Sequence, residues 1–315
     1  MRVALVLGSG GARGYAHIGA IEELHARGHE IVTIAGTSMG ALIGGLEAAG
    51  KLDEFSDWAS NLTQRDVLRL LDPAISLPGA IKAERVVGKV SEILGGVRIE
   101  DLPIPFTAVA ADISNRREVW LQRGPVDAAI RASIAIPSII TPVMLNGRLL
   151  ADGGLLNPVP VEPTTGIPSD FTLAVSLSGK SETANRAPVK ETSQHAGGVD
   201  WGERFRRSAA DALDGNLVRA LVARFVPEAD DAVPPTPATS PFEALPDDLR
   251  TADVITLSLD TMQGLIERFR LAVNPPDILV TVPSRTCSTF DFHRANSVIE
   301  VGRRLTADAL DRAGY

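Results

Sequence analysis

The sequence has a single cysteine, Cys287, among 315 residues. One thiol excludes an internal disulfide and every metal site built from several cysteines, so we expect Cys287 to be passive. Aromatic residues are also scarce, at 4%, and the core must be filled by alanine, valine, leucine and isoleucine. This composition favours helices packed on a sheet over an all-β sandwich.

Basic charge is not in excess, because 31 lysines and arginines stand against 39 aspartates and glutamates, for a net charge of −8. Nucleic acid recognition needs a basic surface that neutralises phosphates, so we expect no nucleic acid partner. Permanent electrostatic attachment to anionic lipid is also disfavoured. Transient contact with a membrane surface through an apolar rim stays open.

Long apolar runs are absent, and nothing approaches the ~18 residues of a membrane span. The best run, residues 134–145, is short and carries Pro137 and Pro142. Residues 3–7 are apolar but lead straight into glycine, which is not the pattern of a signal peptide. We therefore expect a cytoplasmic location.

Short apolar runs at 3–7 and 31–35 predict buried strands, and each precedes a glycine-rich turn and a helical pattern, at 13–27 and 39–49. This repeated order implies parallel strands with crossover helices. The predicted fold class is α/β, a doubly wound, mostly parallel sheet flanked by helices. Further strands are expected at 106–112, 118–122, 149–152, 171–177 and 278–282, and further helices within 52–95 and at 126–133, 252–271 and 294–312.

Residues 179–250 break this pattern. They are polar and irregular at first, then rich in proline and aspartate, with an amphipathic helical pattern only at 203–225. We predict one catalytic domain made of residues 1–178 and 251–315, interrupted by a polar, partly mobile insertion at 179–250.

The pentapeptide Gly36-Thr37-Ser38-Met39-Gly40 has the form G-x-S-x-G. A nucleophilic serine needs a sharp strand-to-helix turn, and Gly36 and Gly40 let the neighbouring backbone approach closely. The start of the following helix brings the N–H of Met39 and a positive dipole end beside Ser38. The context indicates that Ser38 is the nucleophile of an acyl hydrolase, with a plain turn as the alternative.

A glycine-rich loop, Gly8-Ser9-Gly10-Gly11-Ala12-Arg13-Gly14, follows the first strand. Such backbone can point N–H groups at an anion, as in a dinucleotide or phosphate loop or in an oxyanion hole. A dinucleotide fingerprint would need glycine where Arg13 stands and an acidic residue at the end of the second strand. Both are missing, so an oxyanion hole is favoured over a phosphate loop or a plain turn.

The segment Ala151-Asp152-Gly153-Gly154 places an aspartate at a strand end. Asp152 can act as general base if it is held near Ser38 and shielded from water, although Asp-Gly turns are common. The five histidines lie elsewhere: His17 is expected to pack on the sheet, and His25 and His29 to be solvated. None follows a late strand, so a Ser–Asp dyad suits the chain better than a triad.

These three pieces, in this order, resemble the patatin-like phospholipase family, particularly its bacterial branch. Residues 131–138 and the run Asn157-Pro158-Val159-Pro160 resemble the segments that flank the family's catalytic aspartate, and the likeness covers roughly residues 1–180 and, more loosely, 252–312. The resemblance implies a three-layer α/β/α fold and hydrolysis of lipid acyl esters, with no cofactor and no metal. By position it implies Ser38 as nucleophile, Asp152 as base, Gly10, Gly11 and Ala12 as the oxyanion loop and Arg13 as the basic residue of that loop. Together with Met39 at the start of the following helix, these four loop residues make up the predicted oxyanion hole. The family often has glycine where this chain has Ser9.

Other functions stay open at this stage. The same site suits a general carboxylesterase or thioesterase on soluble esters, and a non-catalytic binding module is a second alternative, with a dinucleotide enzyme a distant third. Residues 62–71 and 75–81 are a candidate cap over the pocket that touches lipid, with core packing as the alternative. The sequence does not indicate an oligomeric state.

Overall fold

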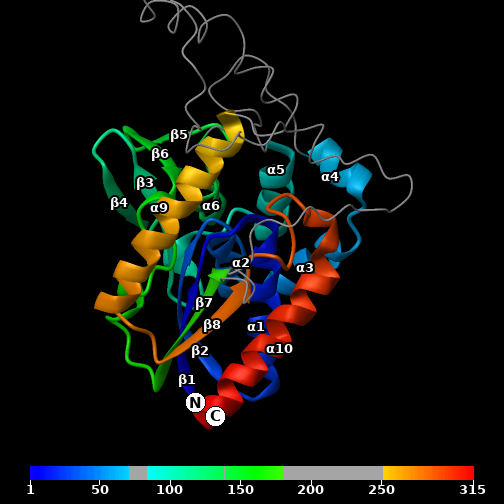
Figure 1. Cartoon of the computed structure of the whole chain (residues 1–315), viewed down its shortest axis with the longest axis vertical. Helices are drawn as coiled ribbons and strands as arrows, with labels where there is room; N and C mark the ends of the chain where they lie inside the picture. Colours follow the sequence, from blue (N-terminus) through cyan, green and yellow to red (C-terminus); the bar gives the residue numbers. More distant parts are fainter. Residues whose placement is uncertain (71–83, 138, 180–250) are drawn as a thin grey trace, which may run out of the picture. The chain divides into compact units, whose positions relative to one another are not determined.

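The computed structural model describes residues 1–70, 84–137, 139–179 and 251–315 (Figure 1). Within these ranges one sheet follows the path β5-β6-β3-β2-β1-β7-β8, and β4 pairs with β3 beside this path. The strands are β1 (Arg2–Leu7), β2 (Glu30–Thr37), β3 (Phe106–Asp112), β4 (Arg117–Leu121), β5 (Val143–Leu145), β6 (Arg148–Asp152), β7 (Phe171–Gly179) and β8 (Ile278–Pro283). The helices are α1 (Ala16–Ala26), α2 (Met39–Ala48), α3 (Leu52–Ser60), α4 (Gln64–Leu70), α5 (Glu84–Leu94), α6 (Val126–Ser133), α9 (Thr251–Val273) and α10 (Ala295–Ala313).

The centre of the sheet is parallel. The pairs β3–β2, β2–β1, β1–β7 and β7–β8 are all parallel. Strands β4 and β6 are antiparallel to β3, and β5 is antiparallel to β6. The predicted mostly parallel sheet flanked by helices is therefore confirmed. The prediction lacks β5, because three residues are too few to show a period.

The two faces of the sheet are both covered, as the alternation of side chains along β1 shows. Val3, Leu5 and Leu7 belong to the main hydrophobic core, which also takes in residues of α1, α2 and α10. Val6 points to the other face, where it clusters with Ala174 of β7 and packs against Leu271 of α9. Strands that are apolar on both faces are what a parallel sheet between helical layers requires.

Helix α1 begins later than its sequence pattern predicts. A 3-10 turn, η1 (Gly11–Tyr15), occupies the first part of the predicted helix, and α1 starts at Ala16. Gly11 has a φ of +59°, and the N–H of Ala12 donates to the carbonyl of Thr289. The loop is thus held by a distant segment, which a local helical pattern cannot reveal.

The chain divides into two compact units, one made of Met1–Lys190 with Met262–Tyr315 and the other of Glu191–Thr261. Of the second unit, only residues 251–261 are described, as the first part of α9. The insertion predicted at 179–250 and its helix at 203–225 lie outside the described residues, apart from Gly179. The same holds for the predicted capping segment at 75–81.

Candidate active site

Ser38 lies between β2 and α2 with a φ of 57° and is only 3% exposed. A positive φ is rare for a residue with a side chain, and such strained positions cluster at functional sites. A Cβ on Gly36 would overlap the carbonyl of Gly40, and one on Gly40 would overlap the carbonyl of Leu7. The pentapeptide therefore has the sharp strand-to-helix turn that a G-x-S-x-G nucleophile needs.

Asp152 lies beside Ser38 because the ends of β2 and β6 meet along the same edge of β3. Thr37, which precedes Ser38, pairs with Val109 of β3, and Asp152 pairs with the next residue, Ala110, while β4 pairs with both from the opposite edge. The side chains of Ser38 and Asp152 are hydrogen bonded. The structure thus brings together two predicted site residues that are more than 100 positions apart.

The Asp152 carboxyl is almost completely buried, at 4% exposure. Burial raises its pKa from 3.8 to about 6, opposed by hydrogen bonds from the Ser38 side chain and the backbone N–H of Gly154, the latter 2.7 Å from Oδ1. Desolvation disfavours the charged form, so this carboxyl holds a proton more tightly than a free one. A pKa near neutrality suits a general base.

The glycine loop is held against the ends of two other segments. The N–H of Gly8 donates to Val175 of β7, and the N–H of Ser9 donates to Pro158, each at 2.9 Å. A Cβ on Gly154 would lie 2.8 Å from the Ser9 hydroxyl and 3.0 Å from Oδ1 of Asp152. The Ser9 side chain, where the family often has glycine, therefore lies close to Asp152.

The predicted oxyanion donors differ in availability. The N–H of Ala12 is occupied by Thr289, at 2.9 Å, whereas those of Gly10, Gly11 and Met39 donate to no acceptor in the described part of the chain. Gly10, Gly11 and Met39 are thus the predicted oxyanion donors whose N–H groups are unpaired within the described residues.

Arg13 holds the loop in place. Its Nε donates to the carbonyl of Gly10 at 3.1 Å, and its Nη1 lies 3.4 Å from the carbonyl of Ser284. The neighbouring Gly14 packs against Met39, since a Cβ on Gly14 would overlap the Cβ of Met39. The loop and the start of α2 are therefore fixed relative to one another.

Ser133, at the end of α6, is a site residue that sequence reasoning missed. Its hydroxyl accepts a hydrogen bond from the N–H of Ser38 at 2.8 Å and donates one to the carbonyl of Val109 at 2.6 Å. It is fully buried. The sequence could have indicated this role, because Ser133 is a hydroxyl residue on the otherwise apolar face of the helix predicted at 126–133.

No histidine of the described residues is hydrogen bonded to Ser38. His17 is completely buried, and its Nε2 bonds the carbonyl of Gly8 at 2.8 Å, while burial lowers its pKa to about 4. A neutral His17 thus supports the glycine loop. His25 is exposed as expected, but His29 is half-buried and contacts Phe171 edge-on, so the expectation that it is solvated is wrong.

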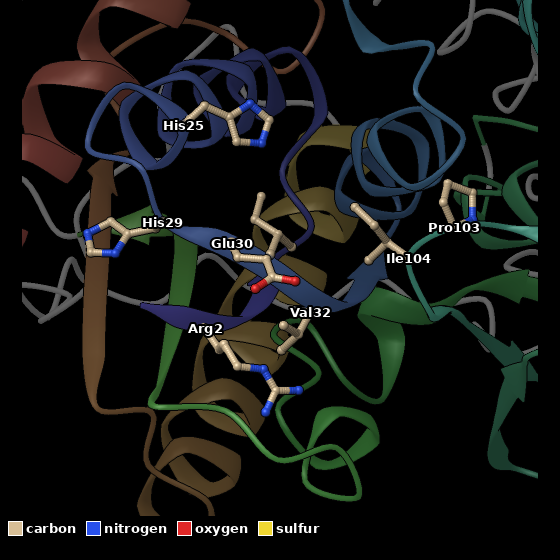
Figure 2. A pocket seen from close by; sticks show the side chains of 8 residues that line it. Arg2, His25, His29, Glu30, Val32, Pro103 and Ile104 are labelled. Atoms are coloured by element: carbon tan, nitrogen blue, oxygen red, sulfur yellow. The ribbon is translucent and has the colours of Figure 1, made fainter.

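Figure 2 shows a cavity of about 500 Å³ whose lining does not include Ser38 or Asp152. It is lined by Arg2 and Glu30, at the amino ends of β1 and β2, with His25 and His29 among the other lining residues. Ser38 follows the opposite, carboxyl end of β2. Ligands of parallel sheets bind beyond the carboxyl ends of the strands, where Ser38 and Asp152 lie.

The described residues contain neither a candidate membrane-spanning helix nor a candidate metal-ion cluster. No helix there is both long and apolar enough to cross a bilayer. No group of three or more histidine, cysteine, aspartate or glutamate side chains in these same ranges is placed to hold a metal ion. Cys287 is buried, and burial raises the pKa of its thiol to about 11, which is unfavourable for a thiolate nucleophile.

Residues 5–165 match the family model named patatin-like phospholipase, a range that includes both Ser38 and Asp152. The chain belongs to the patatin-like phospholipase family. A Mycobacterium tuberculosis protein named an uncharacterized NTE family protein is 46% identical, covering 98% of this chain and 91% of its own length. The family assignment expected from the sequence motifs is therefore confirmed.

A second relative shares only part of the chain. A lysophospholipase of Aspergillus fumigatus is 32% identical over 183 residues, which cover 56% of this chain and 12% of that protein. The crystal structure of VipD from Legionella pneumophila matches with a TM-score of 0.42 and 13% identity, covering 99% of this chain and 67% of that one. Helix α9 and strand β8 lie beyond the range of the family model.

Proposed function

We propose that this patatin-like chain is a serine acyl hydrolase that cleaves carboxylic esters of lipids through a dyad of Ser38 and Asp152. The observation that carries the proposal is the buried Asp152 carboxyl, hydrogen bonded to Ser38, with a pKa of about 6. Such a carboxylate is a stronger base than a free one, whose pKa is ~3.9. Family membership supports lipid acyl hydrolysis as the class of reaction.

In the first step, Asp152 takes the hydroxyl proton of Ser38 as Oγ attacks the ester carbonyl carbon. The carbonyl oxygen becomes an oxyanion, and the unpaired N–H groups of Gly10, Gly11 and Met39 are its proposed donors. Collapse of this intermediate breaks the carbon–oxygen ester bond. The alcohol leaves with the proton from Asp152, and the acyl group stays on Ser38.

In the second step, water replaces the alcohol. Asp152 removes a proton from the water as its oxygen attacks the acyl carbon, and the same N–H donors hold the second oxyanion. Collapse releases the fatty acid and returns the proton from Asp152 to Ser38 Oγ. The site thus returns to its starting state after one ester and one water molecule are consumed.

The proposed substrate type is a phospholipid or lysophospholipid. The name of the Aspergillus relative supports lysophospholipid as the first compound to test. A soluble short-chain ester is the alternative that the same chemistry allows. Transient contact with the lipid surface, through apolar residues near the mouth of the site, belongs to this proposal.

The decisive experiment combines probe labelling with a substrate panel. The full chain is treated with a fluorophosphonate, and fatty acid release is measured from lysophosphatidylcholine, phosphatidylcholine vesicles and p-nitrophenyl esters of increasing chain length. The proposal expects labelling at Ser38, preference for long acyl chains, and loss of both in folded Ser38→Ala and Asp152→Asn. A preference for short soluble esters would favour the carboxylesterase, and a folded chain without labelling would favour a binding module.

A further inference from the structure

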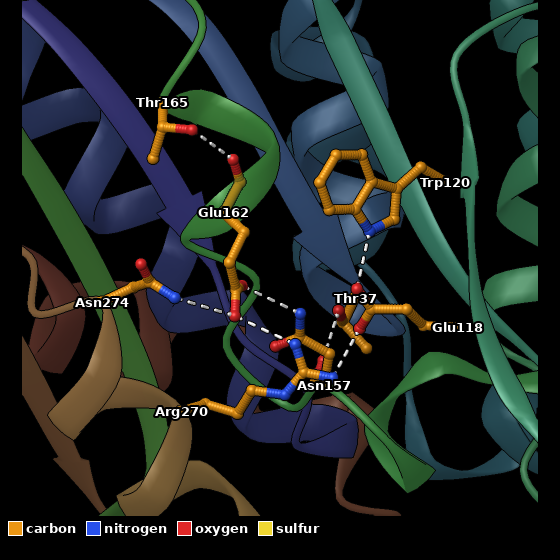
Figure 3. A network of polar contacts seen from close by, with 8 residues as sticks. All are labelled: Thr37, Glu118, Trp120, Asn157, Glu162, Thr165, Arg270 and Asn274. Atoms are coloured by element: carbon orange, nitrogen blue, oxygen red, sulfur yellow. Dashed lines mark hydrogen bonds and ion pairs between the residues drawn. The ribbon is translucent and has the colours of Figure 1, made fainter.

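Arg270 of α9 lies between two carboxylates, one on strand β4 and one in the 3-10 turn η4 (Glu162–Thr164) (Figure 3). Its Nη1 donates to Oε1 of Glu162 at 2.9 Å, and its Nη2 donates to Oε2 of Glu118, on β4, at 2.8 Å. All three side chains are partly shielded from water and lie in the same compact unit. A planar guanidinium can hold two carboxylates at fixed angles, which a lysine cannot do.

Glu162 also contacts Asn157, which is fully buried. The Nδ2 of Asn157 donates to Oε2 of Glu162 at 3.1 Å, as Figure 3 shows. Burial raises the pKa of Glu162, but hydrogen bonds to its carboxylate, including those from Arg270 and Asn157, outweigh burial and hold the pKa below its usual value. Glu162 is therefore an ionised acceptor for both partners.

Asn157 in turn contacts the sequence neighbours of both dyad residues. Its carbonyl accepts a hydrogen bond from Oγ1 of Thr37, which precedes Ser38, at 2.9 Å. Its N–H donates to the carbonyl of Gly153, which follows Asp152, also at 2.9 Å. A single buried residue thus ties the turn that bears Ser38 to the turn that bears Asp152.

We propose that Arg270 is a positioning residue that sets the geometry between Ser38 and Asp152 through Glu162 and Asn157. The inference rests on the proposed function of the dyad, and Arg270 itself touches neither reacting group. Each link is a polar contact in a shielded region, where a lost partner leaves an unsatisfied group and the network shifts. Reaction rates respond strongly to displacements of reacting groups by less than 1 Å.

The test compares Arg270→Gln with Arg268→Gln, a matched control on the same helix whose Nε bonds the local carbonyl of Gly264. Three quantities are measured: the rate of fluorophosphonate labelling at Ser38, kcat and KM for lysophosphatidylcholine, and the Asp152 pKa by carboxyl-carbon NMR titration. Arg270→Gln is expected to lower labelling and kcat about ten- to a hundred-fold. KM is expected to stay within about two-fold, since substrate contacts are unchanged.

The Asp152 pKa is the readout that a merely structural role would not move. The Ser38 hydrogen bond lowers this pKa, so loosening the pair is expected to raise it above the wild-type value of about 6. Arg268→Gln is expected to match wild type in all three quantities. Arg270→Lys keeps the positive charge but not the planar guanidinium that bonds two carboxylates. It is expected to recover only part of the labelling rate and kcat that Arg270→Gln loses.

Glu162→Gln provides a second route if Arg270→Gln does not fold, and it is expected to show the same pattern. In a chain carrying both changes the losses should not add, because both act through Asn157. Equal labelling rates and equal Asp152 pKa values in wild type, Arg270→Gln and Glu162→Gln would overturn the inference. A wild type that releases no fatty acid would instead contradict the proposed function, and the NMR titration would still decide the role of Arg270.

Discussion

The Oγ atom of Ser133 receives the backbone N–H of Ser38 at 2.8 Å, across a separation of 95 residues. The same hydroxyl donates to the carbonyl of Val109 on β3 at 2.6 Å. Ser133 Oγ therefore acts as a donor to β3 and as an acceptor for Ser38. Ser38 has a φ of 57°, a conformation that costs free energy unless its surroundings hold it. Ser133 is therefore one of the groups that hold this strained turn.

Replacing the Ser133 hydroxyl tests whether its hydrogen bond holds the turn at Ser38. Ser133→Ala leaves the buried N–H of Ser38 without an acceptor, which should cost about 1–3 kcal/mol of unfolding free energy. Labelling of Ser38 by a fluorophosphonate should slow about ten-fold or more as the turn relaxes. The control is Ser91→Ala, whose hydroxyl bonds Asp127 away from the turn. Equal labelling in the two variants would remove Ser133 from the site.

The pH dependence of hydrolysis should follow Asp152. The base form is the active one, so kcat/KM is expected to fall about tenfold per pH unit as the pH drops below the pKa of the free enzyme. That pKa is about 6, because the carboxyl is buried. A profile of kcat/KM from about pH 4.5 to about pH 8.5 measures it. A rate that stays level down to the lower limit would show that another group is the base.

The free energy of unfolding should also depend on the Asp152 carboxyl, but it should fall with rising pH where the activity rises. The pKa of Asp152 is about 6 in the folded protein against an ordinary value of 3.8, so the contribution of Asp152 to stability is lost as the pH rises through this interval. Asparagine cannot ionise, and Asp152→Asn should therefore unfold at a higher denaturant concentration above about pH 6, by at most about 3 kcal/mol. Below about pH 4 the two proteins should converge. A variant that is less stable at both pH values would contradict the assigned burial cost.

The glycine loop should tolerate no side chain at Gly11. Its φ is +59°, and a Cβ there would lie 2.5 Å from Cγ2 of Thr289. Gly11→Ala is expected to displace the loop and its N–H groups, and so to lower kcat by about a hundred-fold or more. Gly88→Ala is the control, since nothing lies within 4 Å of that position in α5, and it should gain about 0.5–1 kcal/mol of stability. A Gly11→Ala enzyme as active as the control would rule out a role for the loop in catalysis.

The sequence predicted those parts of the fold that local patterns encode. The buried runs of β1 and β2, the glycines beside Ser38 and the helix after them all lie within the first 50 residues. Helix α6 was predicted with its observed bounds. These features depend on side-chain period and on backbone freedom at glycine, which are properties of neighbouring residues.

Distant segments decided those features that local patterns cannot encode. The antiparallel addition of β6 to β3 follows from pairing between residues about 40 positions apart, and it places Asp152 beside the turn that holds Ser38. Helix α1 starts late because Thr289 holds the N–H of Ala12. No periodic pattern contains that information.

The sequence by itself determined the central parallel strands, the turn at Ser38 and the candidate pair of Ser38 and Asp152, because glycine, apolar runs and strand ends act locally. Only the tertiary structure decided that Ser133 holds the backbone of Ser38 and that Asn157 bonds Thr37 from 120 residues away. It also decided the raised pKa of Asp152, since burial exists only once the layers have packed.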